Sequence, residues 1–212
     1  MLSFKTIGVM PIILTIILAS LPAKAEYKVL FKAPKGYINK TQQFKYRARL
    51  RKEIRNYDSH EVKNVRSWHD VVMQSKATDE RKRLGAIYSA SHKYVRYKTE
   101  RVDIWYTPAE SIKRGIGDCD DFANMYVTAA YLSGSDPVGM WLVAGHTYIR
   151  SKKVGHAIAV IEGADGNQYV LDNTYGRVVL EKDHKNFKPV YSINIEKQAA
   201  YMQVNTAFKD AF

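Results

Sequence analysis

The sequence predicts an α+β fold, with helices in the first part of the chain and strands in the second. Apolar side chains recur at helical spacing between residues 42 and 132, whereas short apolar runs of strand length follow Pro137. No repeat or low-complexity segment divides the chain. With 212 residues, 46% of them hydrophobic, the chain is long and apolar enough for one buried core. We therefore expect a single α+β domain.

The helices are predicted from apolar periodicity and from residues that cap helix ends. Thr107-Pro108-Ala109-Glu110 is a capping box with proline at the first helical position, so a short helix should run to Lys113 and stop at Gly115. The same two kinds of signal place four further helices. These are expected at Gln42–Asn56, at Glu61–Met73, from about Thr78 onward, and at Cys119–Leu132.

Strands are predicted after Pro137, where the runs are rich in β-branched and aromatic residues. The turn-forming segment Gly163-Ala164-Asp165 separates two of these runs, which predicts an antiparallel hairpin. The five expected strands are Met140–Ala144, Ala157–Glu162, Gln168–Asp172, Val178–Glu181 and Val190–Ile195.

The first 25 residues have the parts of a secretory signal peptide. Lys5 is followed by an apolar run from Ile7 to Leu21, and Ala23-Lys24-Ala25 has the small residues at which a signal peptidase cuts. An uncleaved anchor is the alternative, but a run of about 15 residues interrupted by Pro11 is shorter than the ~20 that span a bilayer. We therefore expect residues 26–212 to be exported as a soluble protein.

The chain is basic, with a formal charge of +12 at neutral pH. Loss of Lys5 and Lys24 with the leader would lower this charge to +10. Such a protein can attract polyanions, anionic lipids or an acidic protein. The charge is spread along the chain, its densest part (Lys45 to Arg55) is typical of a solvated helix face, and no nucleic-acid-binding signature is present.

Cys119 is the only cysteine and therefore cannot form an internal disulfide. A free thiol in an oxidising compartment indicates chemistry, although a buried, inert thiol is the alternative. The cysteine begins a predicted helix, where Asp118 is the expected cap and the helix dipole favours a thiolate. Asp118, Asp120 and Asp121 oppose that effect, because nearby negative charge raises the pKa of a thiol.

His156 is the best candidate base for this thiol. If Glu162 faces Gly166 in the predicted hairpin, paired residue numbers sum to 328 and His156 lies directly opposite Asp172. A carboxylate bonded to one ring nitrogen would leave the other nitrogen for the thiol, as in a Cys-His-Asp triad. The alternatives are a surface histidine at a strand end and a turn-forming aspartate.

The other histidines are weaker candidates. His146 is expected in the loop Gly145-His146-Thr147, with no carboxylate opposite it. No pair of histidines has a zinc-binding spacing. The remaining four, expected on polar surfaces or in loops, are His60, His69, His92 and His184.

Four motifs follow one another along the chain: Trp105-Tyr106-Thr107-Pro108-Ala109-Glu110, Gly117-Asp118-Cys119-Asp120-Asp121-Phe122-Ala123, Gly155-His156-Ala157 and Leu171-Asp172-Asn173. Together they resemble the bacterial transglutaminase-like cysteine peptidases, the periplasmic group that includes the LapG-type adhesin proteases. The resemblance covers roughly Trp68 to Asn173, with the motifs in the order and spacing of that family.

The resemblance implies a papain/transglutaminase-like fold for one domain, residues 26–212, with the nucleophile-bearing helix packed on an antiparallel sheet. It implies Cys119 as nucleophile, His156 as general base and Asp172 as the residue that orients it. It also implies a calcium ion on Asp118 and Asp120, which would offset the repulsion of a thiolate. Asp120 and Phe122 stand where glutamate and tyrosine are frequent in the family.

The function expected from the resemblance is that of a periplasmic, calcium-dependent endopeptidase. Its substrate would be a large acidic surface adhesin, and an inner-membrane receptor that sequesters the protease would regulate it, so that the enzyme would control attachment and biofilm. The oxyanion would be held by the Cys119 backbone N–H and a second donor, for which Trp105 and Tyr106 are candidates, with core packing as the alternative role of either residue. The alternatives are a transglutaminase or amidase with the same triad and a non-catalytic, basic, exported binding protein.

Overall fold

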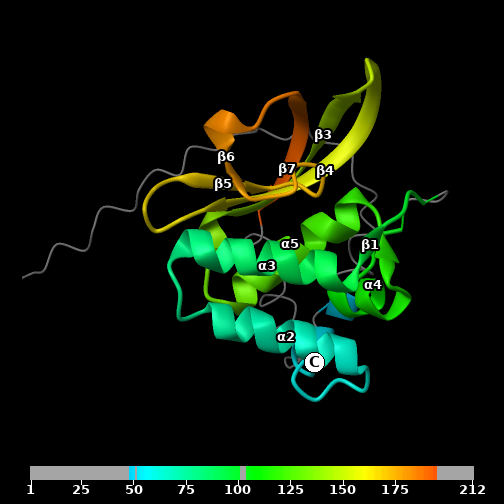
Figure 1. Ribbon diagram of the computed structural model, residues 1–212, viewed down its shortest axis with the longest axis vertical. Coiled ribbons are helices and arrows are strands. Elements are labelled where there is room, and N and C mark those ends of the chain that lie inside the picture. The colour runs from blue at the N-terminus through cyan, green and yellow to red at the C-terminus, as the bar shows by residue number, and fades with distance from the viewer. Residues whose placement is uncertain (1–47, 51, 101–103, 195–212) are drawn as a thin grey trace, which may run out of the picture.

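The computed structural model of the protein describes residues 48–50, 52–100 and 104–194 (Figure 1). Residues 48–50 and 52–54 are helical, which agrees with the second half of the helix expected at Gln42–Asn56. The predicted signal peptide and the start of that helix lie outside the described residues. The four helices that follow are α2 (Lys63–Ser75), α3 (Glu80–Tyr94), α4 (Pro108–Arg114) and α5 (Cys119–Leu132).

The strands form an antiparallel sheet above the helices in Figure 1, with the order β6-β5-β4-β3-β7. A short parallel pair, β1 (Arg96–Tyr97) and β2 (Ile116–Gly117), brings the chain to the start of α5. The five strands of the sheet are β3 (Met140–Ile149), β4 (Lys152–Glu162), β5 (Gln168–Leu171), β6 (Val179–Leu180) and β7 (Phe187–Asn194).

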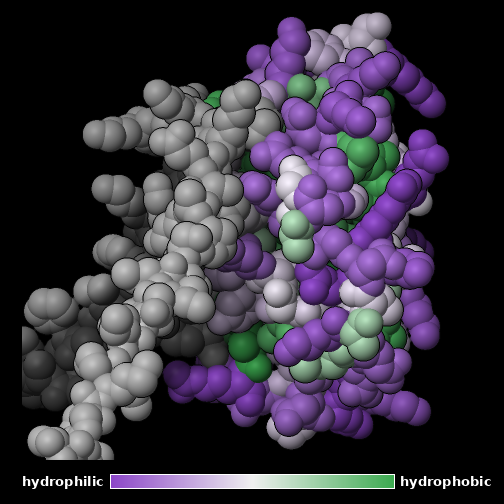
Figure 2. Space-filling model, turned by 90° about the vertical axis from the view of Figure 1, so that its left-hand side faces the viewer, coloured by the Kyte–Doolittle hydropathy of each residue, from purple (hydrophilic) through white to green (hydrophobic). Residues whose placement is uncertain are grey.

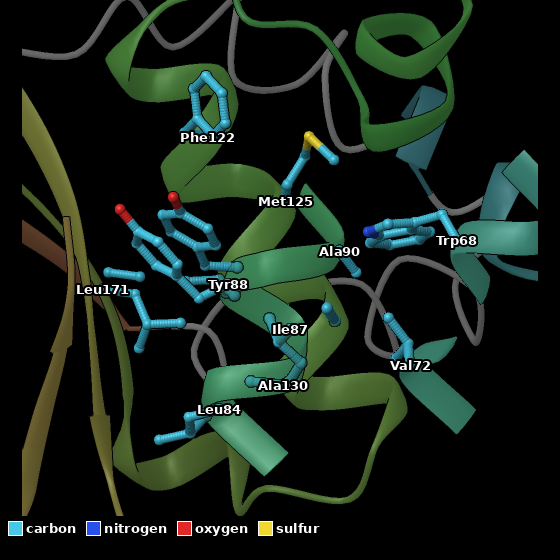
Figure 3. Close-up of a cluster of buried hydrophobic side chains, with 14 of the residues drawn as sticks. Trp68, Val72, Leu84, Ile87, Tyr88, Ala90, Phe122, Met125, Ala130 and Leu171 are labelled. Carbon is cyan, nitrogen blue, oxygen red and sulfur yellow. The ribbon is translucent and has the colours of Figure 1, made fainter. Parts of the chain in front are cut away.

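The core forms around α5, which contacts β4 on one side and α2 and α3 on the other. Its residues from Asp120 to Ala130 are all buried, as expected for a helix enclosed on every face. Figure 3 shows Phe122 and Met125 of α5 among side chains of α2, α3 and β5, including Trp68, Tyr88 and Leu171. Burial against both layers therefore fixes the position of the residue with which α5 begins.

The predicted capping signals are confirmed. The Thr107 side chain accepts from the Glu110 backbone N–H and the Glu110 side chain accepts from that of Thr107, so α4 begins with a complete capping box. Gly115 ends α4 in the left-handed conformation, at φ 66°. The cap of α3 is Asp79, one residue after the predicted start.

Three strands, β3, β4 and β7, are longer than predicted, and the extension of β3 and β4 changes the environment of His146. The pairing of β3 with β4 continues from Met140–Ile161 through Gly145–His156 to Ile149–Lys152, so His146 lies in a strand and the predicted loop is wrong. A glycine in a strand pattern usually indicates a break, but at Gly145 it has another cause. A Cβ at this position would lie 2.3 Å from the Lys188 carbonyl oxygen. The glycine therefore permits close approach of β7 at a register shift in the sheet.

The strand predicted at Val178–Glu181, in contrast, is shorter than expected. Only Val179 and Leu180 pair with β5, and Glu181–Asp183 form a 3₁₀ turn instead. This turn directs the chain back towards the end of β5.

The surface is predominantly polar on the face in Figure 2, where apolar side chains form small separate groups. None of the described helices is both long and apolar enough to cross a membrane.

Candidate active site

Cys119 is the first residue of α5, directly after the N-cap Asp118. The thiol is partly exposed and packs beside a small apolar cluster of Ala123, Leu142 and Ala157. Gly117 makes this helix start possible, because a Cβ at that position would lie 2.8 Å from the Asp121 Cβ. The predicted nucleophile thus occupies a position fixed by the core on one side and by β2 on the other.

The Cys119 thiol is protonated at neutral pH in this environment. Burial, then the negative charges of Asp120 and Asp118, raise its pKa to about 12. Hydrogen bonds from the backbone of Ala157 and Asp120 lower this pKa without outweighing the larger effects. Position at a helix amino terminus is therefore insufficient to produce a thiolate here.

The hydrogen bond from Ala157 places the sulfur beside His156. The ladder between β4 and β5 stops at the pair Ala159–Leu171, so it does not reach Ala157. Where β5 has ended, the Ala157 backbone interacts with the cysteine instead. The nucleophile therefore lies against the peptide unit that joins Ala157 to the predicted base.

His156 is the point at which β4 becomes buried: residues 152–155 are exposed, whereas the histidine is only 7% exposed. Its Nε2 lies 2.9 Å from Oδ1 of Asp172, the residue that follows β5. Since this nitrogen is bonded to the carboxylate, Nδ1 is the nitrogen left for an incoming proton. The two residues paired by the sequence analysis are therefore in contact.

The register that predicted this contact is nevertheless wrong. Paired residue numbers in β4 and β5 sum to 330 instead of 328, with Glu162 opposite Gln168, because the turn also includes Gly166 at φ 73°. A displacement of two residues keeps every side chain on its original face of the sheet. His156 and Asp172 consequently meet as diagonal neighbours, which are also within reach of each other.

Asp172 is 2% exposed and bound by a full set of donors. Its Oδ1 accepts from His156 Nε2 and from the Thr174 N and Oγ1, at 2.9, 2.8 and 2.7 Å, while Oδ2 is 2.8 Å from His184 Nε2. Burial alone would raise the carboxyl pKa, but the bonds from His156, His184 and Thr174 hold it well below its usual range. Asp172 is therefore an ionised carboxylate.

His184 was missed by the sequence analysis, which placed it on a polar surface or in a loop. The residue follows the 3₁₀ turn Glu181–Asp183, but its side chain is only 5% exposed because it faces Asp172. No motif marks it, and only the backward turn after β6 brings it to the carboxylate. His92 also has inward contacts, since its Nε2 lies 2.8 Å from the Tyr126 hydroxyl.

Asp118 and Asp120 fit the chemistry of a calcium site. Side-chain ligand atoms of Asp118, Cys119 and Asp120 lie within 4.8 Å of one another. Two oxygens bound to one calcium ion at 2.3–2.6 Å are separated by at most about 5 Å, so the two carboxylates lie close enough to share an ion. Carboxylate oxygens are ligands that calcium prefers, whereas a thiolate is not.

Asp121 has a different role from its two acidic neighbours. Its side chain is 0% exposed, Oδ1 accepts from the Tyr106 N–H at 2.9 Å, and Oδ2 accepts from the Asp118 N–H at 3.3 Å. The Tyr106 N–H is thus already used and is a poor candidate for an oxyanion donor. Trp105 packs beside Cys119 in the small apolar cluster.

An open hollow of about 500 Å³ is lined by residues of α4, of β2 and of the segment that follows β1. Ile116 of β2 is part of its wall, three residues before the cysteine. Tyr106 contributes a ring covered by the Arg114 guanidinium at 3.6 Å. The remaining lining residues are Lys98, Thr99, Glu100 and Ile104.

The chain belongs to a transglutaminase-like family. The profile of the family described as "Transglutaminase-like domain" matches residues 45–199, which include all the site residues above. No curated protein matches the sequence at a significant level.

Among solved structures, the fold is similar to that of LapG from Legionella pneumophila. The calcium-bound form has a TM-score of 0.56 at 20% identity, with 70% of this chain and 83% of LapG covered. The EGTA-treated form has a TM-score of 0.57 at 20% identity, with coverages of 68% and 81%. These matches confirm the predicted transglutaminase-like α+β fold.

Proposed function

We propose that the protein is a calcium-dependent cysteine endopeptidase of the periplasm with Cys119, His156 and Asp172 as its catalytic triad. The observation that carries the proposal is the bond of the buried His156 to an ionised Asp172, one peptide unit from the place where the Cys119 sulfur contacts β4. Nucleophile, base and orienting carboxylate are thus supplied by three adjoining elements.

In the proposed reaction, the Cys119 sulfur attacks the scissile carbonyl carbon as its proton passes to His156. Burial and the two flanking aspartates raise the pKa of the metal-free thiol to about 12, so without the ion its proton has to pass to His156 as the sulfur attacks. The imidazolium, stabilised by Asp172, then protonates the leaving amine. Water hydrolyses the acyl-enzyme with His156 acting again as base and returns the thiol.

The oxyanion would be stabilised at the start of α5. The first backbone N–H groups of a helix have no partners within it, and the helix dipole favours negative charge there. The Cys119 N–H, which belongs to the nucleophile's own residue, is the proposed oxyanion donor.

Calcium belongs to the proposal because its ligands flank the nucleophile. Asp118 and Asp120 would hold the ion, with backbone carbonyls and water completing a shell of six to eight oxygens. A bound divalent cation would supply positive charge that counteracts the effect of these carboxylates on the thiol pKa. LapG, whose fold this chain shares, is known in a calcium-bound form.

The proposed substrate is an exported protein, specifically a large acidic adhesin at the cell surface whose cleavage would release attached cells. The formal charge, +12 for the full chain and +10 without Lys5 and Lys24 of the leader, favours encounter with an acidic polypeptide. Sequestration by an inner-membrane receptor is the proposed regulation. No nucleic acid is proposed as a partner.

The decisive experiment is a cleavage assay with mapped products. Purified protein would be incubated with the surface proteins of its source cell, with Cys119→Ala as the inactive variant and His69→Gln, on α2, as a matched control. Cleavage by the wild type and the control but not by Cys119→Ala is expected. Incorporation of a labelled primary amine without chain cleavage would instead identify a transglutaminase, and full activity of Cys119→Ala would contradict the mechanism.

Calcium dependence is tested in the same assay. Excess EGTA should suppress cleavage, and added calcium should restore it. Asp120→Asn should lose this response, whereas Asp136→Asn, a change outside the site, should retain it. Undiminished cleavage in EGTA, with no metal found by elemental analysis, would remove calcium from the proposal.

A further inference from the structure

We infer that His184 is a positioning residue for the proposed triad: it holds one oxygen of Asp172 so that the other stays on His156. This inference rests on the proposed function. His184 Nε2 lies 2.8 Å from Oδ2, and His156 Nε2 lies 2.9 Å from Oδ1 of the same carboxylate. Asp172 is therefore held between two imidazole rings.

The two oxygens of Asp172 are held unequally. Oδ1 has three donors, because the N–H and hydroxyl of Thr174 bind it together with His156. His184 is the donor to Oδ2 among the described hydrogen bonds. Removal of His184 would leave a buried oxygen of an ionised group unpaired, which is a costly arrangement. The carboxylate would then turn about its last torsion, which has broad minima, or admit water.

His184 is itself held in place, as a positioning residue must be. The Tyr175 ring lies 4.6 Å from the His184 ring, and the Phe187 ring meets it edge-on at 5.7 Å. The Tyr175 hydroxyl accepts from the Lys185 N–H and donates to the Lys185 carbonyl, at 2.8 and 2.9 Å. Two aromatic rings therefore contact the His184 ring, and the backbone of the next residue is hydrogen-bonded to one of them.

Phe187 links the two histidines directly. Its ring also meets the His156 ring edge-on, with the centroids 6.1 Å apart. The His156 side chain thus has the carboxylate at its Nε2 and an aromatic ring beside it, and His184 contacts both of these neighbours. A change at His184 can therefore reach the base by the hydrogen bond and by packing, and the experiment has to separate the two.

The experiment compares two substitutions at the same position. His184→Gln keeps an N–H donor that can reach Oδ2, whereas His184→Leu fills a similar volume without a donor. With a peptide taken from the mapped cleavage site, His184→Leu should lower kcat by about 10- to 100-fold with KM unchanged, because small displacements of catalytic groups have effects of this size. His184→Gln should restore kcat to within about threefold of the wild type.

A second readout does not require proteolysis. The rate of Cys119 alkylation by iodoacetamide at one fixed pH should fall in His184→Leu and recover in His184→Gln, with His69→Leu as a remote control. If the wild type alkylates rapidly but cleaves nothing, the proposed function fails while the role of His184 is still measured. Denaturant unfolding of each variant would accompany both assays.

A third test uses the wild-type protein alone, so it does not depend on whether a variant folds. Nitrogen-15 NMR of the histidine rings should show His184, like His156, with its proton on Nε2. Equal kcat in His184→Leu and the wild type would overturn the inference. So would equal losses in His184→Leu and His184→Gln, or a His184 ring with no proton on Nε2.

Discussion

Two buried aspartates lie on opposite sides of Cys119, and burial affects them in opposite ways. Asp121, on the helix side, is 0% exposed, and burial raises its pKa to about 7. Asp172, on the sheet side, is 2% exposed, yet its pKa lies well below the usual range. The same kind of side chain, equally removed from water, is thus easily protonated at one end of the site and fully ionised at the other.

The difference lies in the partners. Asp172 has four donor contacts, two of them from imidazole rings. Asp121 has two backbone N–H donors, an Arg114 nitrogen at 3.8 Å, and the repelling charges of Asp118 and Glu100 nearby. Burial therefore does not determine the charge of a carboxylate; the number and kind of its donors do. The negative charge of Asp172, on the sheet side, is therefore stabilised by its own donors. On the helix side the acidic side chains repel one another, and a bound cation would reduce that repulsion.

The largest effect is expected from removing the charge on the sheet side. Asp172→Asn should lower kcat by about 10³- to 10⁴-fold with the fold retained, because an amide cannot stabilise the imidazolium or fix its tautomer. Asp121→Asn, the matched change on the helix side, should lower kcat less than about tenfold. The kcat of both variants is measured by steady-state peptide cleavage. Similar losses of kcat would contradict the different roles of Asp172 and Asp121.

The next effect concerns the cation on the helix side. An ion that binds only the folded state stabilises it by about 2.7 kcal/mol at 100 times its Kd. Calcium should therefore raise the Tm of the wild type and of Asp172→Asn, but not that of Asp120→Asn, as followed by circular dichroism. An equal rise in Asp120→Asn would place the ion elsewhere.

A smaller effect is expected from packing beneath Asp121. Gly117→Ala should lower the free energy of unfolding by about 1–3 kcal/mol, because its Cβ would lie 2.8 Å from the Asp121 Cβ and carboxylate oxygen. Gly85→Ala, in α3, has open space around the new Cβ and should be stabilising by about 0.5–1 kcal/mol. Denaturant unfolding measures the change in the free energy of unfolding for both variants. Equal changes would show that the start of α5 can shift to accommodate the added Cβ.

The smallest effect is confined to acid solution. Because the pKa of Asp172 is lower in the folded state than the ordinary aspartate value of 3.8, its ionisation stabilises the fold above about pH 4, and that contribution is lost as the pH falls further. The difference in unfolding free energy between the wild type and Asp172→Asn should therefore shrink below pH 4. A difference independent of pH would show that Asp172 titrates alike in the folded and unfolded chain.

Much of the fold could be predicted because its signals are local. The capping box at Thr107, the stripe of Val65, Trp68 and Val72 on α2, and the end of α5 at Leu132 each depend on residues a few positions apart. The contact of His156 with Asp172 was also predicted, although from a register two residues away from the true one. The contact survived because it requires the correct face of the sheet more than the correct pairing.

The errors at Gly145 and His184 have a common cause, because both residues are placed by segments distant in sequence. Gly145 is interpreted from the sequence as a break in the strand, because the close approach of Lys188 and Pro189 that requires a glycine is visible only in the fold. His184 gives no local signal, because the turn after β6 brings it to Asp172. The roles of the site residues and the signal peptide stay predictions.

The division of the fold into a helical half and a later sheet also sets an order of events. Cys119 belongs to a helix that ends at Leu132, whereas His156 lies in β4 and Asp172 directly follows β5, both later in the chain. A chain made from its amino terminus therefore completes the segment with the thiol before any strand of the sheet exists. His156, the proposed base, can reach the thiol only when β4 has folded onto α5, so we expect reactivity to be the last property that the folding chain acquires. An unfolded chain would carry no active nucleophile.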